Sequence, residues 1–261
     1  MTVHDPYAGV APSWDADAAR VYQPIAADLV AAAPHPLAGR LVLDAGAGTG
    51  LAGRELVRVG ARVVAVDASV DMLAWHRDVR PPAVAGELTA LPLRDHAVDD
   101  VLAAFVLNHL TAPVDGLREL ARVTRPGGAV LATVYAASSG SPARDRVDET
   151  ALAHGFRWPQ WYLEVKRVAA PQLETPERMT AAARAAGLVA VDAHEYAADV
   201  GIDRAEDLVA YRFGQAHCRT WLDGLTPAER ARVRDAAVAA AAPVMQPYRP
   251  RVVRLVARSP G

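Results

Sequence analysis

Residues 41–50, Leu-Val-Leu-Asp-Ala-Gly-Ala-Gly-Thr-Gly, constrain the fold of this chain more than any other stretch. The apolar run that ends in Asp44 predicts a short buried strand leading directly into a glycine-rich turn. Residues 51–59 then carry apolar side chains at helical spacing and stop at Gly60, so we expect a helix after the turn. Glycines suit such a turn because the backbone must reverse tightly and approach a ligand closely. The stretch therefore predicts a strand-turn-helix unit that binds a ligand at the start of its helix.

A second strand over residues 62–66 ends in Asp67, which lies 23 residues after Asp44. An acidic side chain at about that separation can accept hydrogen bonds from a ribose diol. The dinucleotide fingerprint G-x-G-x-x-G would need a glycine at position 51, where this chain has Leu51. The spacing therefore favours a nucleoside ligand and disfavours a dinucleotide-dependent oxidoreductase.

Composition limits the possible partners. With 261 residues and 52% hydrophobic content, the chain is long enough for one well-buried α/β domain with an elaboration. A net charge of −2 with interspersed signs indicates no nucleic acid and no anionic membrane as partner, which favours a small-molecule substrate. The single cysteine, Cys218, and the lack of histidines paired with carboxylates at helical spacing indicate no metal site. Without an export signal or a membrane-length apolar run, we expect a cytoplasmic protein.

The rest of the chain continues the alternation of strands and helices. Residues 1–39 read as an N-terminal helical cap, and residues 199–248 read as a helical insertion between the last two strands, with helical periods over 208–218 and 226–242. The insertion could cover a substrate or form a subunit contact, so a homodimer is one hypothesis. Further strands are predicted at 83–85, 98–104, 129–135, 188–196 and 252–257, and helices at 115–123, 144–161 (with a turn) and 176–187.

Four motifs in order resemble the class I S-adenosylmethionine-dependent methyltransferases of the small-molecule type. They are D-x-G-x-G-x-G at 44–50, the acidic loop Gly-Glu-Leu at 86–88, Asn-His at 108–109, and Leu-Ala-Arg-Val-Thr-Arg-Pro-Gly-Gly at 120–128. Glu87 stands where the family usually has aspartate. The resemblance implies a Rossmann-like, seven-stranded, mostly parallel α/β sheet with helices on both faces and an inserted helical lid. It implies one methyltransferase domain over 1–261, with residues 40–135 as the cofactor-binding core.

The same resemblance implies S-adenosylmethionine as cofactor and S-adenosylhomocysteine as product. Asp44 and the glycines would hold the methionine portion, and Asp67 would hold the ribose. Met72, with the acidic loop, would face the adenine. The full set of expected cofactor contacts is Asp44, Gly46, Ala47, Gly48, Gly50, Asp67, Ala68, Met72, Glu87, Leu88, Ala104, Phe105 and His109.

Methyl transfer from a sulfonium is an in-line displacement with a neutral leaving group, so positioning supplies most of the catalysis. A general base is needed only where the nucleophile must lose a proton, and His109 is the candidate. The alternative reading of His109 is a hydrogen-bonded structural residue. Aromatic residues in the outer segments predict an apolar or aromatic metabolite, such as one of specialised metabolism. For Trp14 and Tyr22 the favoured alternative is that they pin a helix to the sheet, because large aromatic side chains readily supply packing. The pocket candidates are Trp14, Tyr22, Tyr135, Trp158, Tyr211 and His217.

A second function stays open at this point. A protein of this fold can keep every cofactor motif and bind the cofactor structurally, acting as a cyclase or as a non-methylating binding protein. The mass of the product separates the two functions, because methyl transfer adds one methyl group whereas a cyclase yields an isomer.

Overall fold

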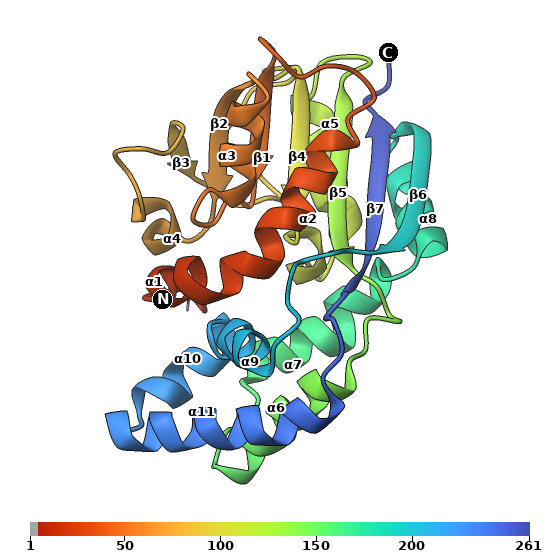
Figure 1. Ribbon diagram of the computed structural model, residues 1–261. Coiled ribbons are helices and arrows are strands. Elements are labelled where there is room, and N and C mark those ends of the chain that lie inside the picture. The colour runs from red at the N-terminus through yellow and green to blue at the C-terminus, as the bar shows by residue number, and fades with distance from the viewer. Residues whose placement is uncertain (1–4) are drawn as a thin grey trace.

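The computed structural model describes residues 5–261 of the chain. Within these residues the core is a sheet of seven strands in the order β3-β2-β1-β4-β5-β7-β6 (Figure 1). Neighbouring strands are parallel except where β7 pairs with β5 and with β6. The prediction of a seven-stranded, mostly parallel sheet is confirmed. The strands are β1 (Leu41–Ala45), β2 (Arg62–Asp67), β3 (Ala83–Ala85), β4 (Asp100–Ala104), β5 (Ala129–Tyr135), β6 (Val189–Ala197) and β7 (Arg251–Arg258).

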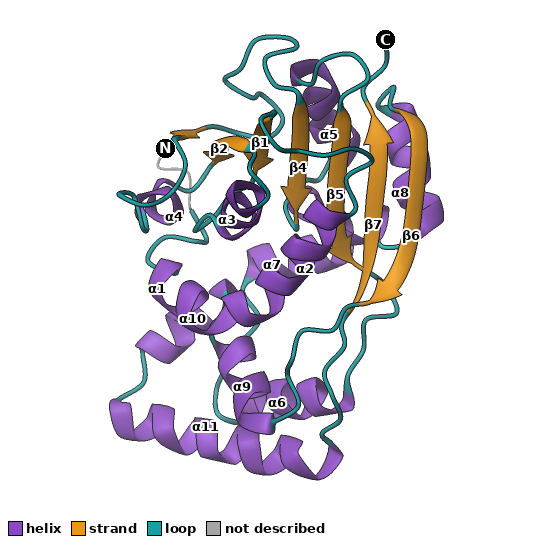
Figure 2. Cartoon of the chain, turned by 45° about the horizontal axis from the view of Figure 1, so that its top comes forward, coloured by secondary structure: helices purple, strands orange, loops and turns teal. Residues whose placement is uncertain are grey.

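Helices cover both faces of the sheet, because successive side chains of a strand point to opposite faces (Figure 2). Val42, Leu102 and Leu131 pack on one face with α2 (Ala19–Ala31) and α3 (Leu51–Arg58). Their neighbours in the strands, Leu43, Val101 and Val130, point to the opposite face. There they pack against α5 (Pro113–Val123) and α8 (Pro176–Ala185).

Apart from α8, the helices that follow β5 and β6 gather at one end of the sheet, toward which the parallel strands point their carboxyl ends (Figures 1 and 2). We call α6, α7, α9, α10 and α11 the helical lobe. Within it α11 packs along α6, and α9 packs against the π-helical segment η1 that precedes α2. The bounds are α6 (Pro142–Ala153), α7 (Gln160–Glu164), α9 (Ala205–Phe213), α10 (Ala216–Asp223), α11 (Pro227–Ala241) and η1 (Trp14–Ala18). The shorter elements are α1 (Ala11–Ser13), α4 (Val70–Ala74), η2 (Leu107–His109), η3 (Val165–Ala169), η4 (Ala170–Gln172) and η5 (Ala242–Val244).

The prediction of one helical segment over residues 208–218 is wrong, since the structure has two helices there. Helix α9 ends at Phe213, and the extended backbone of Gln215 precedes α10. At Gly214 a Cβ atom would lie 2.6 Å from the Cβ atom of Asp17 and 3.0 Å from the carbonyl oxygen of Ser13. Gly214 thus lies in close contact with the part of the chain that precedes α2, which we call the N-terminal segment. This contact is a tertiary feature that hydrophobic periodicity cannot indicate.

Two further boundaries differ from prediction. The strand expected from residue 98 begins at Asp100, because Val98 makes only an isolated bridge to Thr124. The helix with a turn expected over 144–161 is two helices, α6 and α7, separated by residues 154–159.

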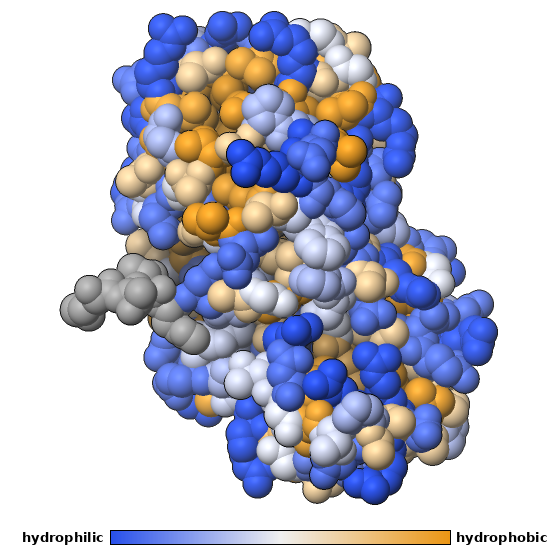
Figure 3. Space-filling view, turned by 90° about the vertical axis from the view of Figure 1, so that its left-hand side faces the viewer, coloured by the Kyte–Doolittle hydropathy of each residue, from blue (hydrophilic) through white to orange (hydrophobic). Residues whose placement is uncertain are grey.

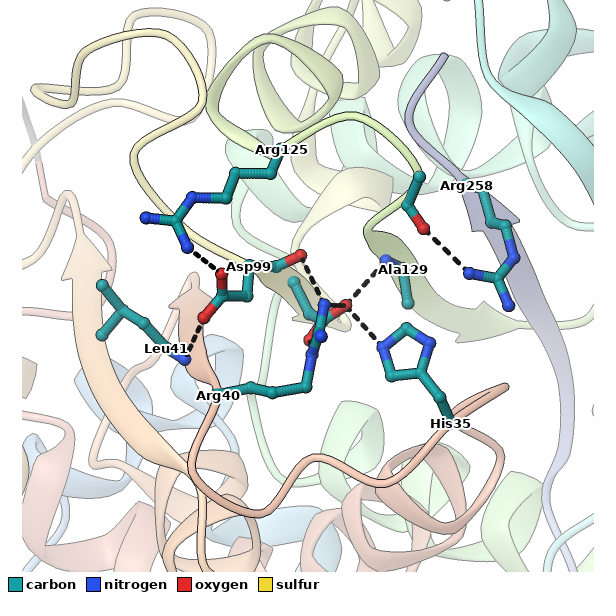
Figure 4. A network of polar contacts seen from close by, with 9 residues as sticks. His35, Arg40, Leu41, Asp99, Arg125, Ala129 and Arg258 are labelled. Carbon is teal, nitrogen blue, oxygen red and sulfur yellow. Dashed lines mark hydrogen bonds and ion pairs between the residues drawn. The ribbon is translucent and has the colours of Figure 1, made fainter. Parts of the chain in front are cut away.

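A buried carboxylate, Asp100, joins the chain before β1 to the starts of β4 and β5. It accepts hydrogen bonds from the Arg40 guanidinium and, at 2.7 Å, from the N–H of Ala129, and its Oδ1 lies 2.9 Å from Nε2 of His35. Because Asp100 has no exposed surface, these partners replace the water that its charge would otherwise require. Figure 4 shows this network beside the contacts of Asp99 with Leu41 and Arg125.

The side of the molecule that carries β3 and α4 shows apolar residues interspersed with hydrophilic ones (Figure 3). Val70, Val79 and Val84, all from the region of β3 and α4, are among the large apolar residues that remain exposed. In the part of the chain described by the structure, no helix has both the length and the apolar character needed to cross a bilayer.

We expect Asp100→Ala to lower the free energy of unfolding by about 2–4 kcal/mol, because the Ala129 N–H and the Arg40 guanidinium both lose their acceptor. Urea denaturation followed by circular dichroism measures the change. Asp115→Ala is the control, since Asp115 and Arg118 form an ion pair with both side chains more than half exposed. Its loss should cost at most ~1 kcal/mol, and equal losses in the two variants would contradict the role given to Asp100.

Candidate functional site

A cavity of about 1020 Å³ lies where the residues after β1, β2, β4 and β5 meet the N-terminal segment and the helical lobe. Ligands of open parallel sheets bind at this edge, outside the carboxyl ends of the strands. Every residue predicted for the site lines the cavity except Gly50: Asp44, Gly46, Ala47, Gly48, Asp67, Ala68, Met72, Glu87, Leu88, Ala104, Phe105, His109, Trp14, Tyr22, Tyr135, Trp158, Tyr211 and His217.

The glycine turn brings the ends of three strands together. The N–H groups of Gly46 and Ala47 donate to the carbonyl oxygen of Val66 at the end of β2, at 2.8 and 3.1 Å. Gly46 has a φ of +72°, and a Cβ atom there would lie 2.4 Å from the Cβ atom of Val106, which follows β4. Gly50 does not belong to the cavity wall; it is the N-cap of α3, where its φ of +88° favours glycine.

Asp67, the last residue of β2, holds its carboxylate on two backbone amides. Oδ2 accepts the N–H of Gly48 and Oδ1 accepts the N–H of Ser69, both at 2.8 Å. Burial raises the pKa of Asp67 above its ordinary value, and the two N–H donors oppose that rise. Because each carboxylate oxygen can accept more than one hydrogen bond, the oriented group can also receive a vicinal diol.

We call the side of the cavity that holds the glycine turn and Asp67 its first half, and several buried oxygens there have no partner among the described residues. Asp44 is 1% exposed, and its Oδ2 makes no hydrogen bond within residues 5–261. Burial raises the pKa of Asp44 to about 7. Oδ1 of Asn108 and Oγ1 of Thr49 also line the cavity without a partner. Since buried polar atoms are normally hydrogen-bonded, these oxygens fit a ligand that brings donors such as an ammonium group.

His109 ends the 3₁₀ turn η2 and faces Tyr7 from the N-terminal segment. Its Nε2 lies 3.3 Å from the Tyr7 hydroxyl, and the two rings meet edge to face at 5.9 Å. Burial lowers the pKa of His109 to about 4, so the ring is neutral at neutral pH. A neutral imidazole can accept a proton, but the hydroxyl contacts the same nitrogen. The catalytic role of His109 stays a prediction.

Aromatic rings form the walls of the other half of the cavity. Trp14 stacks on Tyr22 with their centroids 4.7 Å apart. Trp158, from the residues between α6 and α7, stacks on Tyr162 at 5.1 Å, and the ring of His217 lies 4.4 Å from that of Tyr162. Flat faces of this kind suit an apolar or aromatic ligand.

Sequence reasoning missed part of the cavity wall. Only Tyr162 had a signal, because it adjoins the aromatic-rich stretch that ends at Trp161. The others come from segments far apart in the chain and show no motif or periodicity that would bring them together. The missed lining residues with polar side chains include Asp5, Tyr7, Ser69, Asp148, Tyr162, Arg212 and Gln215.

We expect Gly46→Ala to lower the free energy of unfolding by about 2–5 kcal/mol, through backbone strain and overlap with Val106. Gly127→Ala is a matched control: its φ is +75° and nothing lies within 4 Å of the added Cβ atom. Strain alone should then cost about 1–2 kcal/mol. Urea denaturation of both variants isolates the overlap, and equal losses would contradict the close approach at Gly46.

The sequence of the core has known relatives. Residues 43–132 match the protein family described as Methyltransferase domain. The demethylmenaquinone methyltransferase of Mycobacterium sp. (strain KMS) is 46% identical over 93 residues, which make up 36% of this chain and 40% of that protein. This chain therefore spans well under half the length of the curated relative that it matches.

Solved structures resemble the fold over most of the chain. The phosphoethanolamine N-methyltransferase 2 of Haemonchus contortus, in complex with S-adenosyl-L-methionine, has a TM-score of 0.58 at 16% identity and covers 91% of this chain and 52% of that chain. The [4+2]-cyclase SpnF has a TM-score of 0.57 at 22% identity and covers 91% of this chain and 79% of that chain. At such identities the likeness shows the fold alone.

The matched region contains the glycine turn, Asp67 and the end of β4, so it includes much of the half of the cavity built on strand ends. Residues 43–132 thus match the Methyltransferase domain, and the chain as a whole has the fold of solved methyltransferases.

Proposed function

We propose that the protein transfers a methyl group from S-adenosylmethionine to a small apolar or aromatic metabolite. The observation that carries this proposal is the Asp67 carboxylate, which the N–H groups of Gly48 and Ser69 orient at the edge of the cavity. The match of residues 43–132 to the Methyltransferase domain supports the use of this cofactor, as does the solved neighbour that contains it.

The residues of the first half of the cavity suit the parts of the cofactor. Asp67 would accept the ribose hydroxyls, and the unpartnered oxygens of Asp44 and Asn108 would accept the ammonium group of the methionine portion. Met72 and Leu88, both buried, would pack against the adenine ring.

S-adenosylmethionine supplies a methyl group on a sulfonium and so needs no acid to help its leaving group depart. The chain would then contribute mainly position, because the aromatic walls hold the substrate and exclude water. His109 is neutral at neutral pH and would accept a proton only from a nucleophile that must lose one.

The substrate class rests on the second half of the cavity. Its walls include Trp14, Tyr22, Trp158 and Tyr162, whose faces suit a flat apolar body. A curated relative is named demethylmenaquinone methyltransferase, which supports the same class.

Product mass tests the proposal. The purified protein is incubated with S-adenosylmethionine labelled on its methyl group and with a panel of apolar and aromatic metabolites that includes demethylmenaquinone. A labelled product with one added methyl group supports the proposal, whereas an unlabelled isomer would favour the cyclase alternative. The unlabelled isomer is measured as well because one structural neighbour is a [4+2]-cyclase.

We expect Asp67→Ala to weaken the binding of S-adenosylhomocysteine by about 1.5–3 kcal/mol, the usual scale for losing hydrogen bonds to a charged group. Isothermal titration calorimetry measures the change. Asp71→Ala is the control, since Asp71 lies nearby on α4 but does not line the cavity. An unchanged affinity in Asp67→Ala would remove Asp67 from the ribose site.

We expect the affinity for S-adenosylhomocysteine to rise about tenfold between pH 6 and pH 8. With the pKa of Asp44 at about 7, the carboxyl is largely protonated at pH 6 and must lose its proton to pair with the ligand ammonium. Calorimetry in buffers of different ionisation enthalpy should show proton release at the lower pH. Asp44→Asn should abolish this pH dependence, and its persistence in that variant would assign it to another group.

A further inference from the structure

A polar cluster of buried and half-buried side chains lies in the substrate half of the cavity, between the helical lobe and the sheet. Its tyrosines come from α2, β5 and α9, and its other members from α6, α9 and the start of α10. The cluster consists of Tyr22, Tyr135, Tyr211, Arg212, Gln215 and Asp148, and all six line the cavity.

Arg212 determines how the amide of Gln215 is oriented. A guanidinium can only donate hydrogen bonds, and Nη1 of Arg212 lies 2.6 Å from Oε1 of Gln215. The amide nitrogen must then be the atom that faces the hydroxyls of Tyr22 and Tyr211, at 2.9 and 3.3 Å. Both tyrosine oxygens therefore accept hydrogens from Gln215, and neither hydroxyl can donate to that amide.

The cluster then has more donors than acceptors. Tyr22, Tyr135 and Tyr211 carry three hydroxyl hydrogens, and the one hydrogen bond found between their hydroxyls joins Tyr135 and Tyr211 at 2.9 Å. Among the described residues, at most one of the three hydrogens has an acceptor in this cluster. Burial raises the pKa of all three tyrosines, so they keep their hydrogens at neutral pH. Two O–H donors at the cavity wall are left for a ligand.

The charges of the cluster cancel. Asp148 accepts two hydrogen bonds from the Arg212 guanidinium, at 2.6 and 2.9 Å, in a bidentate ion pair. Arg212 is 6% exposed, so this pair neutralises it within the wall. These six residues thus offer hydrogen-bond donors without a net charge of their own; Arg144, which also lines the cavity, lies 3.7 Å from Asp145.

We propose that this cluster is a subsite for an uncharged oxygen acceptor, a carbonyl group, on the substrate. The inference rests on the proposed function, in which this half of the cavity receives the substrate beside the cofactor. The aromatic walls hold the flat apolar part of the substrate. The tyrosine donors select substrates that carry a carbonyl oxygen, because a ligand without one leaves two O–H groups unpaired at the cavity wall.

Two near-isosteric probes, acetophenone and ethylbenzene, test the subsite, because they differ by a carbonyl oxygen. Their dissociation constants are measured by ligand-observed NMR with the full chain saturated with S-adenosylhomocysteine. In Gln215→Glu the new carboxylate accepts hydrogens from Arg212, Tyr22 and Tyr211, so no hydroxyl donor is left over. We expect acetophenone to bind about 5- to 10-fold more weakly to this variant and ethylbenzene to change less than about twofold.

Tyr22→Phe removes one of the two free O–H donors without adding a charge, and it decides the test if Gln215→Glu does not fold. It also leaves the Gln215 N–H that the Tyr22 oxygen accepted without its partner, so the test asks whether the carbonyl needs the hydroxyl itself. We expect acetophenone alone to weaken, by about 2- to 5-fold. Tyr248→Phe is the matched control: Tyr248 is buried with its ring 5.7 Å from that of Tyr211, but it does not line the cavity. It should leave both dissociation constants unchanged.

The proposal is overturned if acetophenone does not bind the natural protein, or if Tyr22→Phe leaves acetophenone unchanged or weakens both probes equally. Calorimetry with S-adenosylhomocysteine alone separates this result from a failure of the proposed function. If that ligand does not bind, the proposed function fails, and the two probes are then compared in the free protein.

Discussion

The cavity depends on how closely three strand ends approach one another at Gly46. Its N–H donates to the carbonyl oxygen of Val66, which joins the ends of β1 and β2, and its missing side chain leaves room for Val106 after β4. Asp67 closes the same junction by accepting the N–H of Gly48. Backbone groups, one carboxylate and the close-packed Val106 side chain make these contacts, so this edge of the sheet has little freedom to rearrange.

The two halves of the cavity are built differently. The first half consists mainly of backbone and short side chains at strand ends, which consecutive strand-helix units supply. The second half consists of large side chains from the N-terminal segment and the helical lobe. In a fold of this kind, the first half of the cavity can stay the same while the second half changes. The domain match at residues 43–132 therefore does not determine a substrate.

The polar cluster also joins the helical lobe to the sheet. Arg212 and Asp148 connect α9 with α6, and Gln215 connects the start of α10 with Tyr22 on α2. Since these residues are largely buried, their hydrogen bonds specify one docking geometry, because a displaced lobe would leave polar atoms unpaired. The contacts that hold the lobe in place therefore also shape the substrate half of the cavity.

The sheet, the strand-turn-helix unit and the acidic residue at the end of β2 could be predicted from the sequence, because adjacent residues encode hydrophobic period, glycine spacing and strand length. The remaining features depend on tertiary packing, and that packing could not be predicted. It set the N-cap position of Gly50, the break between α9 and α10, and the low pKa of His109, which arises from burial. It also brought Tyr22 to Gln215 across 193 residues of chain. Such contacts depend on how helices pack in three dimensions, and no local pattern of residues records that packing.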